Sequence, residues 1–282
     1  MSREGAETTI ARRLACLRAA AGLRLDEAAA AVGCQQAAIA RLESGREMLS
    51  EHELAALLTR YGVHDWFARE HVLALARGAR TPGWFDAADI PLPQAAALAL
   101  EDHASLIYSY APQFIPPLLQ TRAYAEAAVR AARHPGATPD QIRRGADQVM
   151  RRQEVLDRTA MWVVLDQRAL LEQPLAGVEA RVAQFDALIA AAKERHITLQ
   201  IARSSTVTHY LYQGAPFTLL RFPESHRPDV LALHLLHGPS LVGERQQVED
   251  YHVAFARLYI SAHPIDATAD VLSDLRRAVC GT

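Results

Sequence analysis

Apolar side chains recur at helical spacing through the first 80 residues. Ile10, Leu14 and Leu17 stand four and three positions apart, which predicts an amphipathic first helix over residues 8–21. Ser50, with Glu53 three residues later, forms a capping-box pattern that predicts the start of another helix. Together with segments of similar periodicity, these signals predict five short helices, over residues 8–21, 26–32, 35–43, from 51 onward and over 66–79.

Two of these helices flank a glycine turn. Gly33 follows the helix over residues 26–32 and supplies the backbone freedom that a tight bend between helices needs. In the next helix Ile39 and Leu42 face the expected core, so Gln36, Ala37, Ala40 and Arg41 fall on the outward face. Small domains present a helix to the major groove of DNA in this way, which predicts a DNA-binding regulator.

The pattern changes after residue 80. Proline and glycine interrupt the helical periodicity between Arg80 and Pro93, which predicts a domain over residues 1–80 and a second one over residues 81–282. In the second domain, amphipathic helices alternate with short runs of strand-forming residues. We expect a mainly α protein with a mixed α+β C-terminal domain, with helices over residues 95–108, 122–132, 139–158, 178–195 and 246–262, and strands over residues 161–165, 197–201, 217–222 and 230–235.

The segment from Gly22 to Gly45 has the order Gly-Leu, short helix, Gly, second helix and Glu-x-Gly. This order resembles the Xre-type, lambda-repressor-like helix-turn-helix domains over residues 8–65. The resemblance implies a five-helix bundle, a structural pair of Arg18 with Glu43, and binding to operator DNA as a homodimer. It implies base contacts from Gln36, Ala37, Ala40 and Arg41, and we expect phosphate contacts from Arg12, Arg13, Arg24, Gln35 and Arg46.

Residues 81–275 carry several short sequences that together resemble the C-terminal domain of the WhiJ-like, antitoxin-like regulators of actinomycetes. They include Gly-Trp-Phe at 83–85, Ile-Pro-Pro-Leu-Leu-Gln-Thr at 115–121, Met-Arg-Arg-Gln at 150–153 and Pro-Phe-Thr-Leu-Leu at 216–220. The resemblance implies transcription control, often together with a small partner protein. The C-terminal domain of this family has no settled ligand, so we expect no cofactor. An alternative function is therefore that of an antitoxin-like interaction protein, which sequesters a small partner and uses DNA binding for autoregulation.

Polar and aromatic residues of the second domain leave two further interpretations open. Aromatic residues and histidines either fill the core or line an effector pocket, for which the candidates are Trp84, Tyr108, Phe114, Tyr124, Trp162, His209 and His234. His209, His234 and His237, or the run Glu101-Asp102-His103, could in principle support catalysis or a metal. Their spacing follows no known catalytic or metal-binding motif, so we expect neither an enzyme nor a metal site.

Composition adds little to the DNA-binding hypothesis and suggests the compartment. The net charge is −2, and residues 1–80 hold eleven arginines against ten acidic residues, so no general basic field is present.

Cys16, Cys34 and Cys280 have no metal-ligand spacing and are expected to be reduced thiols. There is no apolar run long enough for a membrane span and no signal-peptide pattern. We therefore expect a cytoplasmic protein. Because Lys193 is the only lysine and asparagine is absent, a GC-rich source genome is expected.

Overall fold

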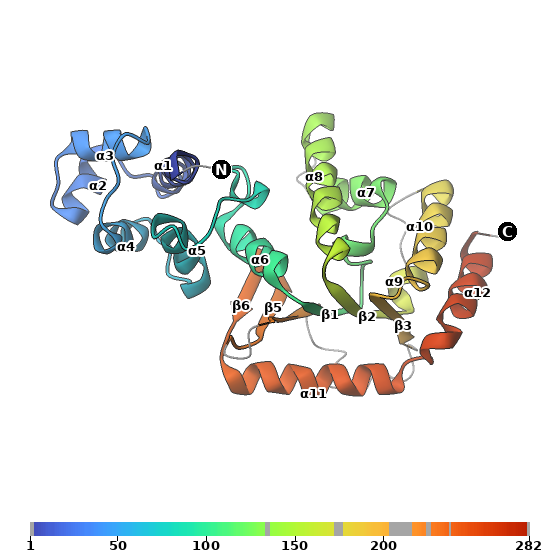
Figure 1. Ribbon diagram of the computed structural model, residues 1–282. Coiled ribbons are helices and arrows are strands. Elements are labelled where there is room, and N and C mark those ends of the chain that lie inside the picture. The colour runs from blue at the N-terminus through green and yellow to red at the C-terminus, as the bar shows by residue number, and fades with distance from the viewer. Residues whose placement is uncertain are drawn as a thin grey trace. The chain divides into compact units, whose positions relative to one another are not determined.

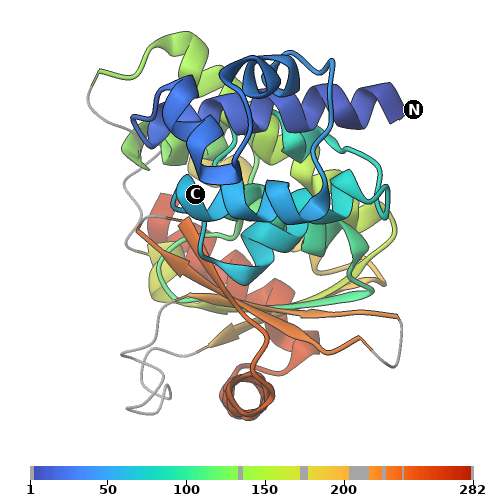
Figure 2. The same ribbon diagram turned by 90° about the vertical axis from the view of Figure 1, so that its left-hand side faces the viewer.

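The computed structural model describes residues 3–132, 136–171, 177–202, 216–223, 227–236 and 238–280, without the side chains of residues 3, 4 and 280. The chain divides into two compact units, Met1–Leu100 and Glu101–Thr282. Figures 1 and 2 show the first unit as helices only and the second as a sheet with helices on both faces. The expected fold class, a helical N-terminal bundle with a mixed α+β C-terminal domain, is confirmed.

Five helices form the bundle of the first unit. A common core holds them together, and the bounds of α2 to α5 lie close to those expected from the sequence. The Ser50 hydroxyl accepts a hydrogen bond from the backbone N–H of Glu53 at 3.3 Å, while the Glu53 carboxylate accepts from the backbone N–H of Ser50 at 2.9 Å. This reciprocal cap begins α4. The helices are α1 (Arg3–Ala20), α2 (Leu25–Val32), α3 (Gln36–Glu43), α4 (Glu51–Arg60) and α5 (Trp66–Ala76).

The segment over residues 81–100 counts with the first unit. Its short 3-10 helix η1 (Trp84–Asp86) is tied to α5 because His71 Nε2 lies 2.8 Å from a carboxylate oxygen of Asp86. Arg80 contributes a further bond of 2.9 Å to the other oxygen of that carboxylate. Helix α6 (Leu92–His103) begins in this segment, and Leu92 packs into the core of the bundle.

The second unit is built on a six-stranded sheet with the order β3-β2-β1-β4-β5-β6. Strands β1, β2 and β3 run parallel, whereas β4, β5 and β6 join as antiparallel neighbours beside β1. Two parallel connections need crossovers, and the helices after β1 and β2 provide them. The strands are β1 (Leu106–Ala111), β2 (Ala160–Asp166), β3 (Ile197–Ala202), β4 (Phe217–Arg221), β5 (Val230–Leu235) and β6 (Gly238–Val242).

Helices cover both faces of this sheet (Figure 1). Val248, Phe255 and Leu258 of α11 pack on one face, against apolar side chains of β1, β2, β4 and β5. The crossover helices lie over the other face. The remaining elements are η2 (Pro117–Leu119), α7 (Arg122–Ala132), α8 (Pro139–Arg152), η3 (Gln153–Asp157), α9 (Arg168–Leu171), α10 (Val178–Ala191), α11 (Arg245–Ser261), η4 (Ile265–Ala267) and α12 (Thr268–Cys280).

Some details of this unit differ from the sequence-based expectation. The helix expected over residues 95–108 ends at His103, and the next residues form the central strand β1. A short, mainly apolar run fits a helix or a buried strand equally well, and its pairing with β2 and β4 decides for the strand. Strand β6 and helix α12 were not among the expected elements.

Candidate nucleic-acid interface

The turn between α2 and α3 has the geometry of a glycine helix cap. Gly33 has a φ of 68°, in the left-handed region that favours glycine. The backbone N–H of Cys34 donates to the carbonyl of Ala29 at 3.1 Å, and that of Gly33 donates to Ala30 at 3.4 Å. These two bonds satisfy carbonyls that the end of α2 would otherwise leave open. The turn therefore fixes the direction in which α3 leaves.

Helix α3 has one buried and one exposed face. Ile39 and Leu42 are buried in the core of the bundle, and Ala38 of the same helix is also buried. The residues expected to contact bases all lie on the exposed face: Gln36, Ala37, Ala40 and Arg41. Only the glutamine and the arginine in this set offer hydrogen-bonding groups for base edges.

An ion pair between Arg18 and Glu43 joins the end of α1 to the end of α3. The Nε and Nη2 atoms of Arg18 donate to the two carboxylate oxygens of Glu43, at 2.7 and 2.8 Å. Nη1 donates to the carbonyl of Leu23 at 2.8 Å, so the same guanidinium also fixes the start of the loop before α2. The hydrogen bond to Glu43 raises the pKa of Arg18. This pair holds α3 against α1 and is unavailable for DNA.

Arg41 is exposed, but one of its donors is already in use. Its Nε atom lies 2.6 Å from a carboxylate oxygen of Glu47, just beyond the end of α3. A bidentate contact with guanine uses two N–H groups of one guanidinium edge, and the two Nη atoms stay available for it. Glu47 therefore orients Arg41 and also places a negative charge beside it.

The residues expected to contact phosphates have different surroundings. Arg12, Arg24, Gln35 and Arg46 are exposed. Arg24 forms an ion pair with Asp26, an exposed contact that costs little to exchange for a phosphate. Gln35 is the residue before α3, and its side chain makes no capping bond.

The expectation for Arg13 is wrong. Its side chain is 5% exposed, and its guanidinium donates to the carbonyls of Ala87 and Ile90 within the first unit. Burial lowers the pKa of Arg13, with a partly compensating effect of Asp86. Neighbouring positions on a helix lie about 100° apart, so Arg12 faces outward while Arg13 faces the segment over residues 87–90. Arg13 is a structural residue and cannot reach a phosphate.

The second unit contains a cavity of about 390 Å³, and few of the expected pocket residues line it. Phe114 and His234 do. Tyr108 and Trp162 lie on the opposite face of the sheet, packed with Phe255 of α11. The correction follows from strand alternation, because even-numbered residues of β1 and β2 face α11.

Other predicted residues lie elsewhere. Tyr124 is buried beside a small second cavity, and Trp84 belongs to the first unit, where it packs against Phe85. His209 and His237 lie outside the described residues. Asp102 forms an ion pair with Arg158, so the run Glu101-Asp102-His103 does not act as one polar group.

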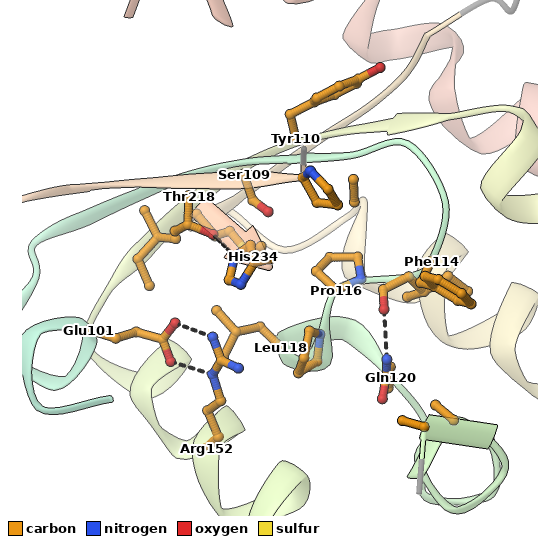
Figure 3. A pocket seen from close by; sticks show the side chains of 18 of the residues that line it. Glu101, Ser109, Tyr110, Phe114, Pro116, Leu118, Gln120, Arg152, Thr218 and His234 are labelled. Carbon is orange, nitrogen blue, oxygen red and sulfur yellow. Dashed lines mark hydrogen bonds and ion pairs between the residues drawn. The ribbon is translucent and has the colours of Figure 1, made fainter. Parts of the chain in front are cut away.

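The sequence did not reveal the main polar feature of the cavity, a paired Arg152 and Glu101. Nε and Nη2 of Arg152 donate to the two oxygens of Glu101, at 2.6 and 2.7 Å (Figure 3). Burial opposes the charge on Arg152, but Glu101 more than offsets this and raises its pKa. The two residues are 51 positions apart, and only packing of the end of α8 near the end of α6 joins them.

His234 lies beside this pair. Its Nε2 atom is 2.9 Å from the hydroxyl oxygen of Thr218. The side chain borders the cavity, and the residue as a whole is exposed. Desolvation of the ring and the charge of Arg152 lower the pKa of His234 to about 4, so the ring is neutral at pH 7.

Two absences bear on other kinds of site. Among the described residues, no cluster of three or more histidine, cysteine or acidic side chains is arranged to hold a metal ion. In the same part of the chain, no helix has the length and apolarity that crossing a membrane requires.

Comparison with known proteins agrees with the two units. A family model described as Helix-turn-helix domain matches residues 9–66, and one described as Domain of unknown function (DUF5753) matches residues 94–274. No curated protein and no solved structure matched the chain. The helix-turn-helix match supports a DNA-binding regulator of transcription. The second match covers more than half of the chain. The chain therefore belongs to the family described as Domain of unknown function (DUF5753), with a helix-turn-helix domain before that region.

Proposed function

We propose that this protein is a transcriptional regulator that binds operator DNA as a homodimer through α3, and that its C-terminal unit receives the controlling signal. The observation that carries the DNA-binding part is the exposed face of α3, held in place by the Gly33 turn and the Arg18–Glu43 pair. A rigid, exposed recognition helix is what major-groove binding requires.

Base reading by this face rests on few groups. Gln36 can pair with adenine and Arg41 with guanine, each pair contributing about 1–3 kcal/mol of discrimination. Ala37 and Ala40 offer methyl groups, which can contact the methyl group of thymine. We therefore expect modest sequence discrimination per subunit. Two subunits on adjacent half-sites would add their discrimination, which supports the proposal of a dimer.

We further propose that the C-terminal unit is a regulatory domain and not an enzyme. Its cavity contains a neutral histidine and an arginine neutralised by a glutamate. Such a set provides hydrogen bonds for recognition. The Thr218 hydroxyl lies 2.9 Å from His234 Nε2, but the Glu101 carboxylate is bound to Arg152 and does not orient this histidine as the acid of a catalytic triad would. The resemblance to WhiJ-like regulators of actinomycetes points in the same direction.

The test is a gel shift of the full chain with DNA from upstream of its own gene, at low salt. Ala40→Glu places a carboxylate on the exposed face of α3 and should abolish the shift on every sequence. Ala123→Glu adds the same charge at an exposed position of α7 and is the matched control. Absence of a shift with folded protein, or equal loss in both variants, would refute the proposed interface.

The dimer needs a separate measurement. Sedimentation of the complex with a duplex that carries one operator should give two chains per duplex. A single chain per duplex at saturation would show that the homodimer is wrong, and it would leave DNA binding itself intact.

A further inference from the structure

One end of the cavity in the second unit lies where ligands commonly bind in sheets of this kind. It extends over one face of the sheet, from Ile107 and Met161 near the starts of β1 and β2 to the loop after β1 and the neighbouring ends of β4 and β5. In open α/β sheets, ligands bind outside the carboxyl ends of the parallel strands. Here β1 is the strand at which the parallel half of the sheet meets the antiparallel half.

The size of the cavity exceeds that of a packing defect. Its volume of about 390 Å³ falls within the range of small-molecule pockets, roughly 300–1,000 Å³. Protein interiors are otherwise close-packed, with few voids larger than a water molecule. Small side chains on one face of α7 keep the space open, namely Ala128, Ala131 and Ala132.

Most of the wall is apolar. Ile107 of β1 and Met161 of β2 form the side toward the sheet, and Pro116 and Leu118 form the side toward the loop after β1. Figure 3 shows the proline ring and the leucine side chain facing the polar residues across the space. A bound molecule would therefore bury mainly apolar surface.

Most of the polar groups lie on one side, whereas Gln120 lies on the other, where its amide donates to the carbonyl of Ile115. Nε and Nη2 of Arg152 are engaged by Glu101, and Figure 3 shows the remaining nitrogen, Nη1, directed away from Glu101 toward the space. The hydroxyl of Ser109 points to the same region from β1, and His234 borders it from β5. Nη1 and the serine hydroxyl are both hydrogen-bond donors that a ligand oxygen in the cavity can use.

The charges at this end cancel. The cation of Arg152 is paired in two-pronged geometry with the carboxylate of Glu101, and both side chains are largely buried, with 15% and 6% exposure. His234 is neutral at pH 7. An anionic ligand would have to compete with Glu101 for the guanidinium and lose its hydration shell in an apolar cavity. A neutral acceptor faces neither penalty.

We propose that this cavity binds an uncharged, mainly apolar small molecule that carries a carbonyl or similar oxygen at the end facing Arg152 and Ser109. The proposal gives a chemical class to the signal received by the C-terminal unit. Its regulatory meaning rests on the function proposed above, whereas binding itself does not.

The test uses prodan, an uncharged naphthalene that carries a ketone and whose emission shifts to shorter wavelength in apolar surroundings. Titration of the full chain should give saturable binding of one probe per chain. Ala128→Phe fills the cavity and should weaken binding more than about tenfold. Ala123→Phe, on an exposed face of the same helix, is the matched control and should leave binding unchanged. Equal affinity in both variants would overturn the site.

Two further comparisons test the chemical class. Ser109→Ala should weaken prodan about threefold to tenfold, as expected for one lost hydrogen bond, and leave the same ring without its ketone, 2-dimethylaminonaphthalene, unaffected. Equal loss for both probes would refute recognition of the oxygen. This comparison also stands if Ala128→Phe fails to fold, which its melting curve would reveal.

Competition tests the charge. The ketone 2-nonanone should displace prodan at concentrations at which nonanoate does not, and the reverse order would overturn the uncharged class. Because these titrations contain no DNA, a chain that fails to shift DNA can still bind prodan, and a chain that shifts DNA without binding prodan contradicts only the ligand proposal.

Discussion

Adjacent arginines of α1 provide a sharp test of how the first unit divides structure from DNA contact. Arg12 is exposed, whereas Arg13 is 5% exposed and donates to the carbonyls of Ala87 and Ile90. Replacing each by methionine keeps much of the side-chain length and removes the charge. We expect Arg13→Met to destabilise the first unit and Arg12→Met to affect DNA binding alone.

The magnitude for Arg13 follows from its two hydrogen bonds. Bonds made by a charged donor contribute about 1.5–3 kcal/mol each. Removing the charge also removes the cost of burying it, which the lowered pKa of Arg13 indicates, and this offsets part of the stabilisation lost with the hydrogen bonds. We expect a net loss of about 2–3 kcal/mol, against less than about 0.5 kcal/mol for Arg12→Met. In a unit of about 100 residues, 1 kcal/mol corresponds to about 4–8 °C in melting temperature.

Two assays separate the roles. Thermal and urea unfolding report stability, and fluorescence anisotropy with a labelled duplex of unrelated sequence reports phosphate contacts. Arg12→Met should reduce the slope of log Kobs against log salt by about 0.9, since one phosphate contact is lost. Arg13→Met should leave the slope unchanged below its melting temperature. A reduced slope with unchanged stability for Arg13→Met would refute the structural assignment.

Three other predictions concern the turn, the recognition helix and the cavity. Gly33→Ala should cost about 1–2 kcal/mol on unfolding, because its φ of 68° is strained for alanine although its Cβ would meet nothing. Gly136→Ala, whose φ lies outside the left-handed range and whose Cβ would also meet nothing, is the control and should cost less than about 0.5 kcal/mol. Arg41→Ala should reduce the discrimination at one base pair by about 1–3 kcal/mol. Arg46→Ala should weaken binding to all DNA sequences alike and lower the slope of log Kobs against log salt by about 0.9. Equal losses of affinity for both variants on specific and random duplexes would contradict these roles. His234 has a pKa of about 4 when folded, below the unfolded value of 6.5, so the unfolded chain binds the proton more readily and stability should fall as the pH drops from about 6.5 toward 4. The free energy of unfolding of the His234→Gln variant, measured by urea titration, should fall less steeply over that pH range. A pH dependence identical to that of the unchanged chain would refute the assignment.

Local signals were sufficient for helices α2 to α5 of the first unit. Each helix boundary there depends on residues within four or five positions of it, as the Ser50 cap and the Gly33 turn illustrate. Periodicity alone divided α3 into Ile39 and Leu42 inside and Gln36 and Arg41 outside. Such signals are readable because helix capping and helical spacing are properties of short segments.

The second unit depended on contacts between distant segments. The run from Leu106 to Ala111 becomes a central strand only because β2 and β4 pair with it. Strand alternation then directs Tyr108 to the α11 face and Ser109 to the cavity. The aromatic residues that suggested a pocket mostly fill the core instead, since composition does not tell which face of a strand a residue occupies.

By itself, the sequence determined the helix-turn-helix unit, the division of α3 into two faces and the mixed α+β character of the second unit, because these rest on local propensity and periodicity. Only the tertiary structure decided that Arg13 is buried while Arg12 is exposed, since the segment over residues 87–90 folds back onto α1. It likewise decided the cavity, whose polar end brings Glu101, Arg152 and His234 together from three separate elements. Such a site is a property of packing, because none of its contacts lies within one helix or strand.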